Sequence, residues 1–157
     1  MTDENKLKIL KDLLVDEEHT TEELKELVIK SKPFIQIESK SGDIIIKPIY
    51  SYSTKEKIIL FLIGNYFSKE LGLNDDEITS RYISEQINIP ITTISGPLGD
   101  FVNSKIVSND NGIYSIKFYE ISSQLDIITN KYLLKNDLPK TQIERKIAAS
   151  LITSFII

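Results

Sequence analysis

The apolar residues of the first fifty positions follow a helical spacing twice and then a strand-like one. Residues 5–15 repeat leucine along one face of a predicted helix. A second helix is expected from about Thr20, because Thr20 and Glu23 have the spacing of a capping box, and Pro33 lies beyond its end. Residues 34–46 then place a polar turn with Ser and Gly between two short apolar runs, which predicts a β-hairpin.

The strongest helical pattern covers Thr54–Leu71. Ser53 or Thr54 can cap its start, and Ile58–Phe67 is apolar nearly all round. Gly72 is suited to ending the helix. Because a helix that is apolar on every side is usually buried, we expect this one to lie at the centre of a small domain.

Two shorter helices and a turn are predicted next. The first covers residues 79–87 and ends in a turn at 88–90, because the residue before a proline is pushed out of the helical region. Thr92 or Thr93 is expected to cap the second, which should start close to residues 94–96 and end near residue 104. The Gly96-Pro97 pair then falls in its first turn, where proline is tolerated.

A second hairpin and two helices complete the pattern. Asn111-Gly112 is strongly suited to a two-residue hairpin turn, and apolar residues at 106–107 and 113–118 flank it. An apolar stripe predicts a helix over Glu120–Leu134, and a last helix is expected over residues 141–157. The chain is therefore expected to have a mainly α (α+β) fold.

The same elements divide the chain into three predicted regions. Residues 1–53 form an N-terminal extension of helices and a β-hairpin, residues 54–118 form the central unit, and residues 119–157 form C-terminal helices. The amphipathic C-terminal helices are a candidate dimerisation region.

Composition limits the chemistry that the chain can carry. It contains no cysteine and one histidine, His19, which excludes disulfides, thiol nucleophiles, histidine-based triads and multi-histidine metal sites. Phosphate-binding and dinucleotide-binding glycine motifs are also absent. We expect a protein that is not an enzyme and that holds no cofactor and no metal.

The sequence also carries expectations about location. Residues 1–16 are charged and amphipathic, unlike a signal peptide, and the longest apolar run, Ile58–Phe67, is too short to span a bilayer. The absence of cysteine fits a reducing cytoplasm. A cytoplasmic protein without a membrane partner is expected.

The order of helix, helix, turn, helix and β-hairpin from Thr54 to Phe118 resembles the winged helix-turn-helix superfamily, and more loosely the small archaeal-type winged-helix transcriptional regulators. The residues that match a phrase common in that superfamily are Tyr82–Pro90, Thr93–Ser95, Leu98, Phe101-Val102 and Lys105–Val107. Asn88 and Ser104 stand where glycine is common. The resemblance covers about 65 of the 157 residues.

The resemblance implies a DNA-binding mode in which the second helix of the pair enters the major groove and the hairpin follows the backbone. The residues that would then contact DNA are Thr92, Thr93 and Ser95 at phosphates, Gly96 at a close backbone approach, Asn103 at a base, and the cations Lys55, Arg81, Lys105 and Lys117. Asp100 and Asp110 would repel phosphate.

Charge leaves the function open between two classes of binding protein. The net charge of the chain is −4, and residues 54–118 hold 6 basic and 8 acidic side chains, or −2. Because phosphate neutralisation supplies most nonspecific DNA affinity, this balance is evidence against tight DNA binding. The first hypothesis is a DNA-binding homodimer, a transcriptional regulator or chromatin-associated protein, joined through its C-terminal helices. The alternative is a winged-helix module that binds a protein partner without DNA.

Overall fold

A computed structural model of the protein describes residues 3–10 and 21–135. In chain order its elements are α1 (Asp3–Leu10), α2 (Thr21–Ser31), β1 (Ile35–Ile37), β2 (Ile44–Ile46), α3 (Thr54–Glu70), α4 (Ser80–Ile87), α5 (Ile91–Asn103), β3 (Val107–Asp110), β4 (Ile113–Ile116), α6 (Phe118–Thr129) and the π-helical η2 (Asn130–Lys135). The described chain is mainly helical with two small antiparallel sheets, which confirms the predicted α+β class.

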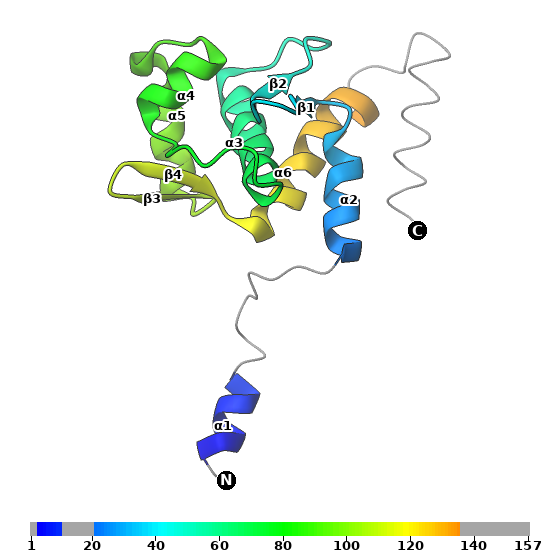
Figure 1. The fold of residues 1–157 in the computed structure, drawn as a ribbon, viewed down its shortest axis with the longest axis vertical. Helices are drawn as coiled ribbons and strands as arrows, with labels where there is room; N and C mark the ends of the chain where they lie inside the picture. Colours follow the sequence, from blue (N-terminus) through cyan, green and yellow to red (C-terminus); the bar gives the residue numbers. More distant parts are fainter. Residues whose placement is uncertain (1–2, 11–20, 136–157) are drawn as a thin grey trace.

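The central helix is α3, as its sequence predicted. Its side chains from 58 to 63 are at most 2% exposed, and strands of both sheets together with α4, α5 and α6 pack against it (Figure 1). Ser53 and Glu56 form a capping box at its start, in which each side chain accepts a hydrogen bond from the backbone N–H of the other residue. Gly72, in the left-handed conformation, follows its last turn.

The first hairpin, β1–β2, lies against one side of α3. Its strands pair antiparallel over the residues predicted for them. Strand and helix meet at Gly64, where an added Cβ would overlap Cγ2 of Ile44. The hairpin turn is tied to the same helix, because Ser68 Oγ donates a hydrogen bond of 2.8 Å to the carbonyl of Gly42.

A tight turn joins α4 to α5, as predicted. Thr79 caps α4 by accepting a hydrogen bond from the N–H of Tyr82 at 3.1 Å. Asn88 follows the helix with φ 57°, a left-handed conformation that asparagine tolerates better than most residues. The N–H of Ile89 donates back to the carbonyl of Ser84, which closes the turn.

The prediction for the start of α5 is wrong. The helix begins at Ile91, directly after Pro90, and neither Thr92 nor Thr93 caps it. The carbonyl of Pro90 accepts a hydrogen bond of 2.9 Å from the N–H of Thr93, which closes the first turn. The helix therefore starts about one turn before the predicted residues 94–96, and no side chain caps it. Pro97 therefore lies inside the helix, where it removes the hydrogen bond to the carbonyl of Thr93.

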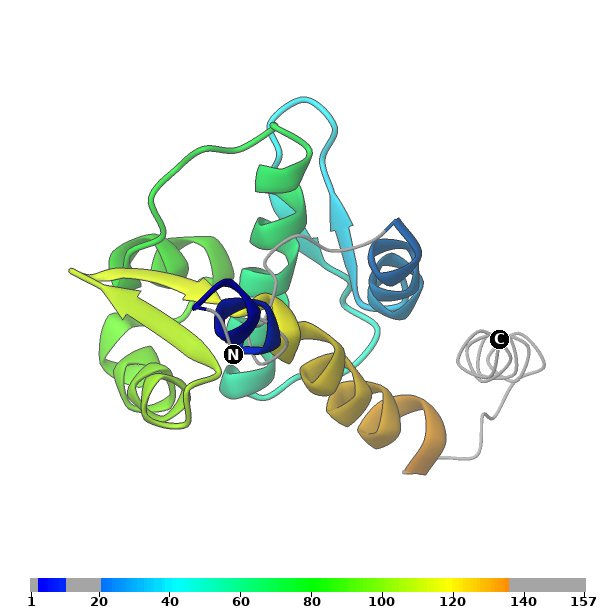
Figure 2. The same cartoon turned by 90° about the horizontal axis from the view of Figure 1, so that it is seen from below.

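The second hairpin, β3–β4, turns at Asn111-Gly112 as predicted. Both residues have positive φ, 52° and 86°, which a two-residue hairpin turn of this kind requires. The N–H of Tyr114 donates to the carbonyl of Ile78 at 2.8 Å, so the segment before α4 is bound to the hairpin. The hairpin projects beside α5, on the side of the molecule away from α2 (Figure 2).

The helix α6 packs along α2 and begins two residues earlier than predicted. The buried ammonium group of Lys30 on α2 lies 3.0 Å from both the carboxylate of Asp126 and the hydroxyl of Ser122 on α6. From Asn130 the chain continues as the wider turns of η2. Buried apolar residues from Leu27 to Leu133 form one hydrophobic cluster.

The predictions for the two ends of the chain are tested only in part. Of the helix expected over residues 5–15, the structure describes α1, on which Leu7 and Leu10 are exposed. The capping residue Thr20 and the helix expected over residues 141–157 lie outside the described residues.

Candidate nucleic-acid interface

The α5 helix presents one exposed face made mostly of small side chains. It buries Ile94, Leu98 and Phe101 against the rest of the fold. The exposed residues of this helix are Ile91, Thr92, Thr93, Ser95, Gly96, Gly99, Asp100 and Asn103. The structure therefore brings the predicted DNA-contacting residues of α5 to one accessible surface, and that surface carries no cation of its own.

The three hydroxyl groups expected at phosphates differ in what they already contact. Ser95 Oγ donates its hydrogen to the carbonyl of Ile91 at 2.7 Å, so it would have to break that bond before donating to a phosphate. Thr92 and Thr93 are exposed in the first turn, and their hydroxyls have no partner in the described part of the chain. Because the helix has no side-chain cap, its first N–H groups are also open to an anion.

The glycines of α5 stand where an added side chain would meet nothing. Neither Gly96 nor Gly99 has a neighbouring heavy atom within 4 Å of the position that a Cβ would take. Gly96 has a further reason to be glycine, since a residue before Pro97 resists the helical conformation when it carries a Cβ. The continuity of α5 through Pro97 is therefore enough to explain a glycine at position 96.

The structure places the predicted cation Lys55 beside α5 but pairs it with an acid of that helix. Lys55 Nζ lies 3.2 Å from Asp100 Oδ2, and both side chains are more than half exposed. The same ammonium group lies 6.0 Å from the centre of the Phe101 ring. The contribution of Lys55 to the positive potential of this surface is thus cancelled by Asp100.

The other three predicted cations have no ion pair with any described carboxylate. Lys105 follows α5 with φ 63°, and Lys117 stands nearby across the hairpin, because its N–H donates to the carbonyl of Ile106. Arg81 lies exposed in the first turn of α4. Glycine is common at the position of Ser104 in the superfamily that the sequence resembles. The backbone of Ser104 has a right-handed conformation, with φ −80°, and the left-handed residue is the next one, Lys105.

A cluster around Glu56 was missed by sequence reasoning. Its carboxylate caps α3, accepts a hydrogen bond of 2.6 Å from the hydroxyl of Tyr132, and lies 3.2 Å from Lys131 Nζ. The Tyr132 ring in turn stacks on Tyr50 at 4.8 Å between ring centres. The capping box was visible in the sequence, but a partner 76 residues away has no local signal.

Burial and hydrogen bonding act in opposite directions on the pKa of Glu56. Burial would raise that pKa, but hydrogen bonds from Tyr132, Ser53 and Lys131 outweigh it, so the pKa lies below its usual value. Burial and the neighbouring carboxylate raise the pKa of Tyr132. The cluster fixes η2 to the start of α3, and nothing in its geometry points to a reaction.

Within residues 3–10 and 21–135, no helix has the length and apolar character needed to cross a membrane, and no three acidic or histidine side chains are grouped to hold a metal ion. Comparisons with protein-family models, with curated proteins and with solved structures found no match for this chain.

Proposed function

We propose that residues 54–118 form a winged helix-turn-helix and that this unit binds duplex DNA. The observation that carries the proposal is the spatial arrangement of α4, the Asn88 turn, α5 and the adjoining β3–β4 hairpin, with one face of α5 exposed. The backbone bond between Tyr114 and Ile78 supports it, because it holds the hairpin against the helix pair as one unit.

The accessible face of α5 can contact DNA through neutral groups. Thr92, Thr93 and the first N–H groups of the helix can bind phosphate, and Asn103 can bind a base edge. Gly96 and Gly99 let the backbone approach the groove closely. In this proposal α5 supplies shape and hydrogen bonds, and the cations come from outside the helix.

The available cations set the expected strength of binding. With Lys55 held by Asp100, three predicted cations remain per subunit: Arg81, Lys105 and Lys117. Three phosphate contacts give a slope of roughly −2.7 in a plot of log affinity against log salt, and affinity then falls about 40-fold between 50 and 200 mM salt. We propose modest, salt-sensitive binding.

The proposal includes a homodimer in the cytoplasm, acting as a transcriptional regulator or a chromatin-associated protein through binding and without catalysis. The C-terminal helices are the proposed interface, and Ile127 on α6 and Leu134 on η2 leave apolar surface exposed there. Two subunits double the number of phosphate contacts, which offsets the small number of cations in each.

A binding measurement at low salt tests the DNA proposal. Fluorescence anisotropy of a labelled 30-base-pair duplex in about 50 mM salt is expected to show saturable binding in the nonspecific range, roughly 1–100 µM. The absence of binding at roughly 100 µM protein would contradict it. Light scattering on the full chain is expected to give twice 17.9 kDa, and Ile127→Asp is expected to lower the mass to that of one subunit.

One observation favours the second candidate, a winged-helix module that binds protein. The α5 helix contains no Lys or Arg, and its one charged side chain is the acid Asp100. A neutral surface of small residues suits contact with another protein as well as with DNA. If the duplex fails to bind while Ile127→Asp still lowers the mass, the protein-binding function is preferred.

A further inference from the structure

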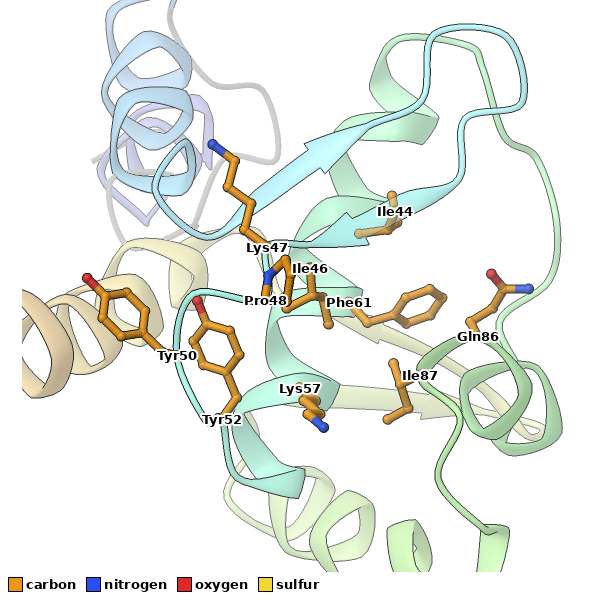
Figure 3. A pocket seen from close by; sticks show the side chains of 10 residues that line it. All are labelled: Ile44, Ile46, Lys47, Pro48, Tyr50, Tyr52, Lys57, Phe61, Gln86 and Ile87. Carbon is orange, nitrogen blue, oxygen red and sulfur yellow. The ribbon is translucent and has the colours of Figure 1, made fainter.

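A pocket of about 320 Å³ lies on a part of the fold that the proposed DNA contacts do not use. It is open to solvent on one side and is bordered by β2 and the connector after it, the first half of α3 and the last turn of α4 (Figure 3). The apolar side chains facing it are Ile44, Ile46, Phe61 and Ile87. This size is at the lower end of the range of small-molecule sites, about 300–1,000 Å³. About half of the accessible lining is polar, so the pocket offers a ligand both apolar and polar contacts.

The charged side chains that line the pocket favour a negatively charged ligand. Lys47 and Lys57 line the pocket, whereas no carboxylate does. Within the described residues neither lysine forms an ion pair, so their charges are not neutralised by the protein. An acid would be attracted to this lining, and an amine would be repelled.

The two lysines are oriented differently. Lys57, in the first half of α3, lies between Tyr52 and Ile87 (Figure 3). The ammonium group of Lys47 points away from Phe61 and Ile87, so mainly its aliphatic stem faces the pocket. Lys57 is therefore the cation placed to meet an anionic group bound against the apolar wall, and Lys47 provides a natural control.

The ring of Tyr52 forms part of the same wall, but its hydroxyl points away from Lys57 and is closed to the pocket (Figure 3). Its side chain is 8% exposed, and its hydroxyl has no hydrogen-bond partner in the described part of the chain. Burial and the neighbouring Tyr50, Tyr132 and Glu56 raise the pKa of this hydroxyl, so it stays protonated, and Tyr52 offers the pocket its ring only.

We infer that this pocket binds a small organic acid, with its aliphatic or aromatic body against Phe61 and Ile87 and its carboxylate at Lys57. The charge and the volume of the pocket favour a small acid over a neutral molecule and over a larger acid. A neutral molecule would leave the lysine charge unused, and a large acid would exceed the volume. The inference does not rest on DNA binding, and its test contains no DNA.

The first experiment is an NMR titration of the isotopically labelled full chain with benzoate, and in parallel with benzamide and benzylamine. Benzoate is expected to give saturable shifts concentrated at the amides of residues 44–52, 57–61 and 86–87. Benzamide should bind about tenfold more weakly, because it lacks the charge that strengthens the bond to lysine, and benzylamine should not bind. No saturable shift up to about 10 mM benzoate, or equal shifts with all three probes, would overturn the inference.

Two matched variants locate the site. Lys57→Met keeps the aliphatic stem and is expected to weaken benzoate about tenfold while leaving benzamide unchanged. Lys47→Met removes the same charge from the same pocket rim and is expected to change benzoate affinity less than about twofold. Equal losses in the two variants would show a diffuse charge effect and overturn the assignment of Lys57. Ile87→Phe, which narrows the pocket without changing charge, should weaken both benzoate and benzamide, and unchanged binding would place the ligand elsewhere.

Discussion

The ammonium group of Lys55, in the first turn of α3, lies 3.2 Å from the carboxylate of Asp100 on the exposed side of α5. Because both side chains are more than half exposed, the pair contributes little to stability, at most about 1 kcal/mol. Its larger effect is on the surface potential. A cation that would otherwise face phosphate is neutralised by an acid on the very helix that the proposed function places in the groove.

Replacing that acid is expected to strengthen DNA binding. Asp100→Asn removes a negative charge from α5 and releases Lys55, so affinity for duplex DNA should rise and the salt slope should steepen by about 0.9. Anisotropy titrations between 50 and 200 mM salt measure both quantities. Glu22→Gln, on α2, changes net charge by the same amount and serves as the control. Equal effects from the two variants would mean that total charge, and not the Lys55–Asp100 pair, limits binding.

A substitution at Lys105 is expected to change stability and DNA binding in opposite directions. It occupies the left-handed position after α5, with φ 63°, and its N–H and that of Ile106 donate back to the last turn of the helix. Lys105→Gly relieves the backbone strain and is expected to raise the free energy of unfolding by up to about 1 kcal/mol. The same change removes a proposed phosphate contact, so DNA affinity should fall and the salt slope should become shallower by about 0.9.

Urea unfolding and anisotropy on one Lys105→Gly preparation measure the two effects together. Lys117→Gln removes a second predicted cation without touching a left-handed residue. It is expected to weaken DNA binding to a similar degree and to leave stability within about 0.5 kcal/mol. If Lys105→Gly is more stable but binds DNA as before, Lys105 is only a helix terminus and not a DNA contact.

Local signals in the sequence were sufficient for most helices and for both hairpins. The cap at Ser53, the turn at Asn88 and the Asn111-Gly112 turn each depend on a few neighbouring residues, and each was predictable for that reason. The start of α5 failed because Pro97 was taken as a first-turn proline, whereas the helix tolerates it in its interior.

Features that depend on distant residues could not be predicted. Two such features are the Lys55–Asp100 ion pair and the hydrogen bond from Tyr132 to Glu56. Each joins elements that lie close together only because of the packing around α3. The pocket behind β2 likewise combines three segments, none of which has a ligand-binding motif of its own. The candidate surface on α5 was predictable as a helix face, but the neutralisation of Lys55 by Asp100 was not.

The Glu56 cluster predicts a pH dependence of stability. Its folded pKa is lowered, so its stabilising effect is complete above the unfolded value of about 4.3 and is lost as the pH falls through the folded pKa. Glu56→Gln removes the charge and weakens the bonds to Tyr132 and Lys131. At pH 7 it should lose about 1–3 kcal/mol of unfolding free energy.

Urea unfolding of wild type and Glu56→Gln between pH 7 and 3 measures this dependence, and the difference should shrink below about pH 4. Glu70→Gln, at the exposed end of the same helix, is the control and is expected to change stability by less than about 0.5 kcal/mol. A difference between wild type and Glu56→Gln that stays constant down to pH 3 would contradict an ionised Glu56 as the source of the stability.

Two glycines in helices give opposite expectations for the same substitution. At Gly64, inside α3, a methyl group would overlap Cγ2 of Ile44 on β2, so Gly64→Ala is expected to lose about 1–3 kcal/mol of unfolding free energy. At Gly99, inside α5, the added Cβ meets nothing within 4 Å, and Gly99→Ala should gain about 0.5–1 kcal/mol from helix propensity alone. Urea unfolding of the two variants compares them directly. Equal stabilities would mean that β2 does not press on α3 at Gly64.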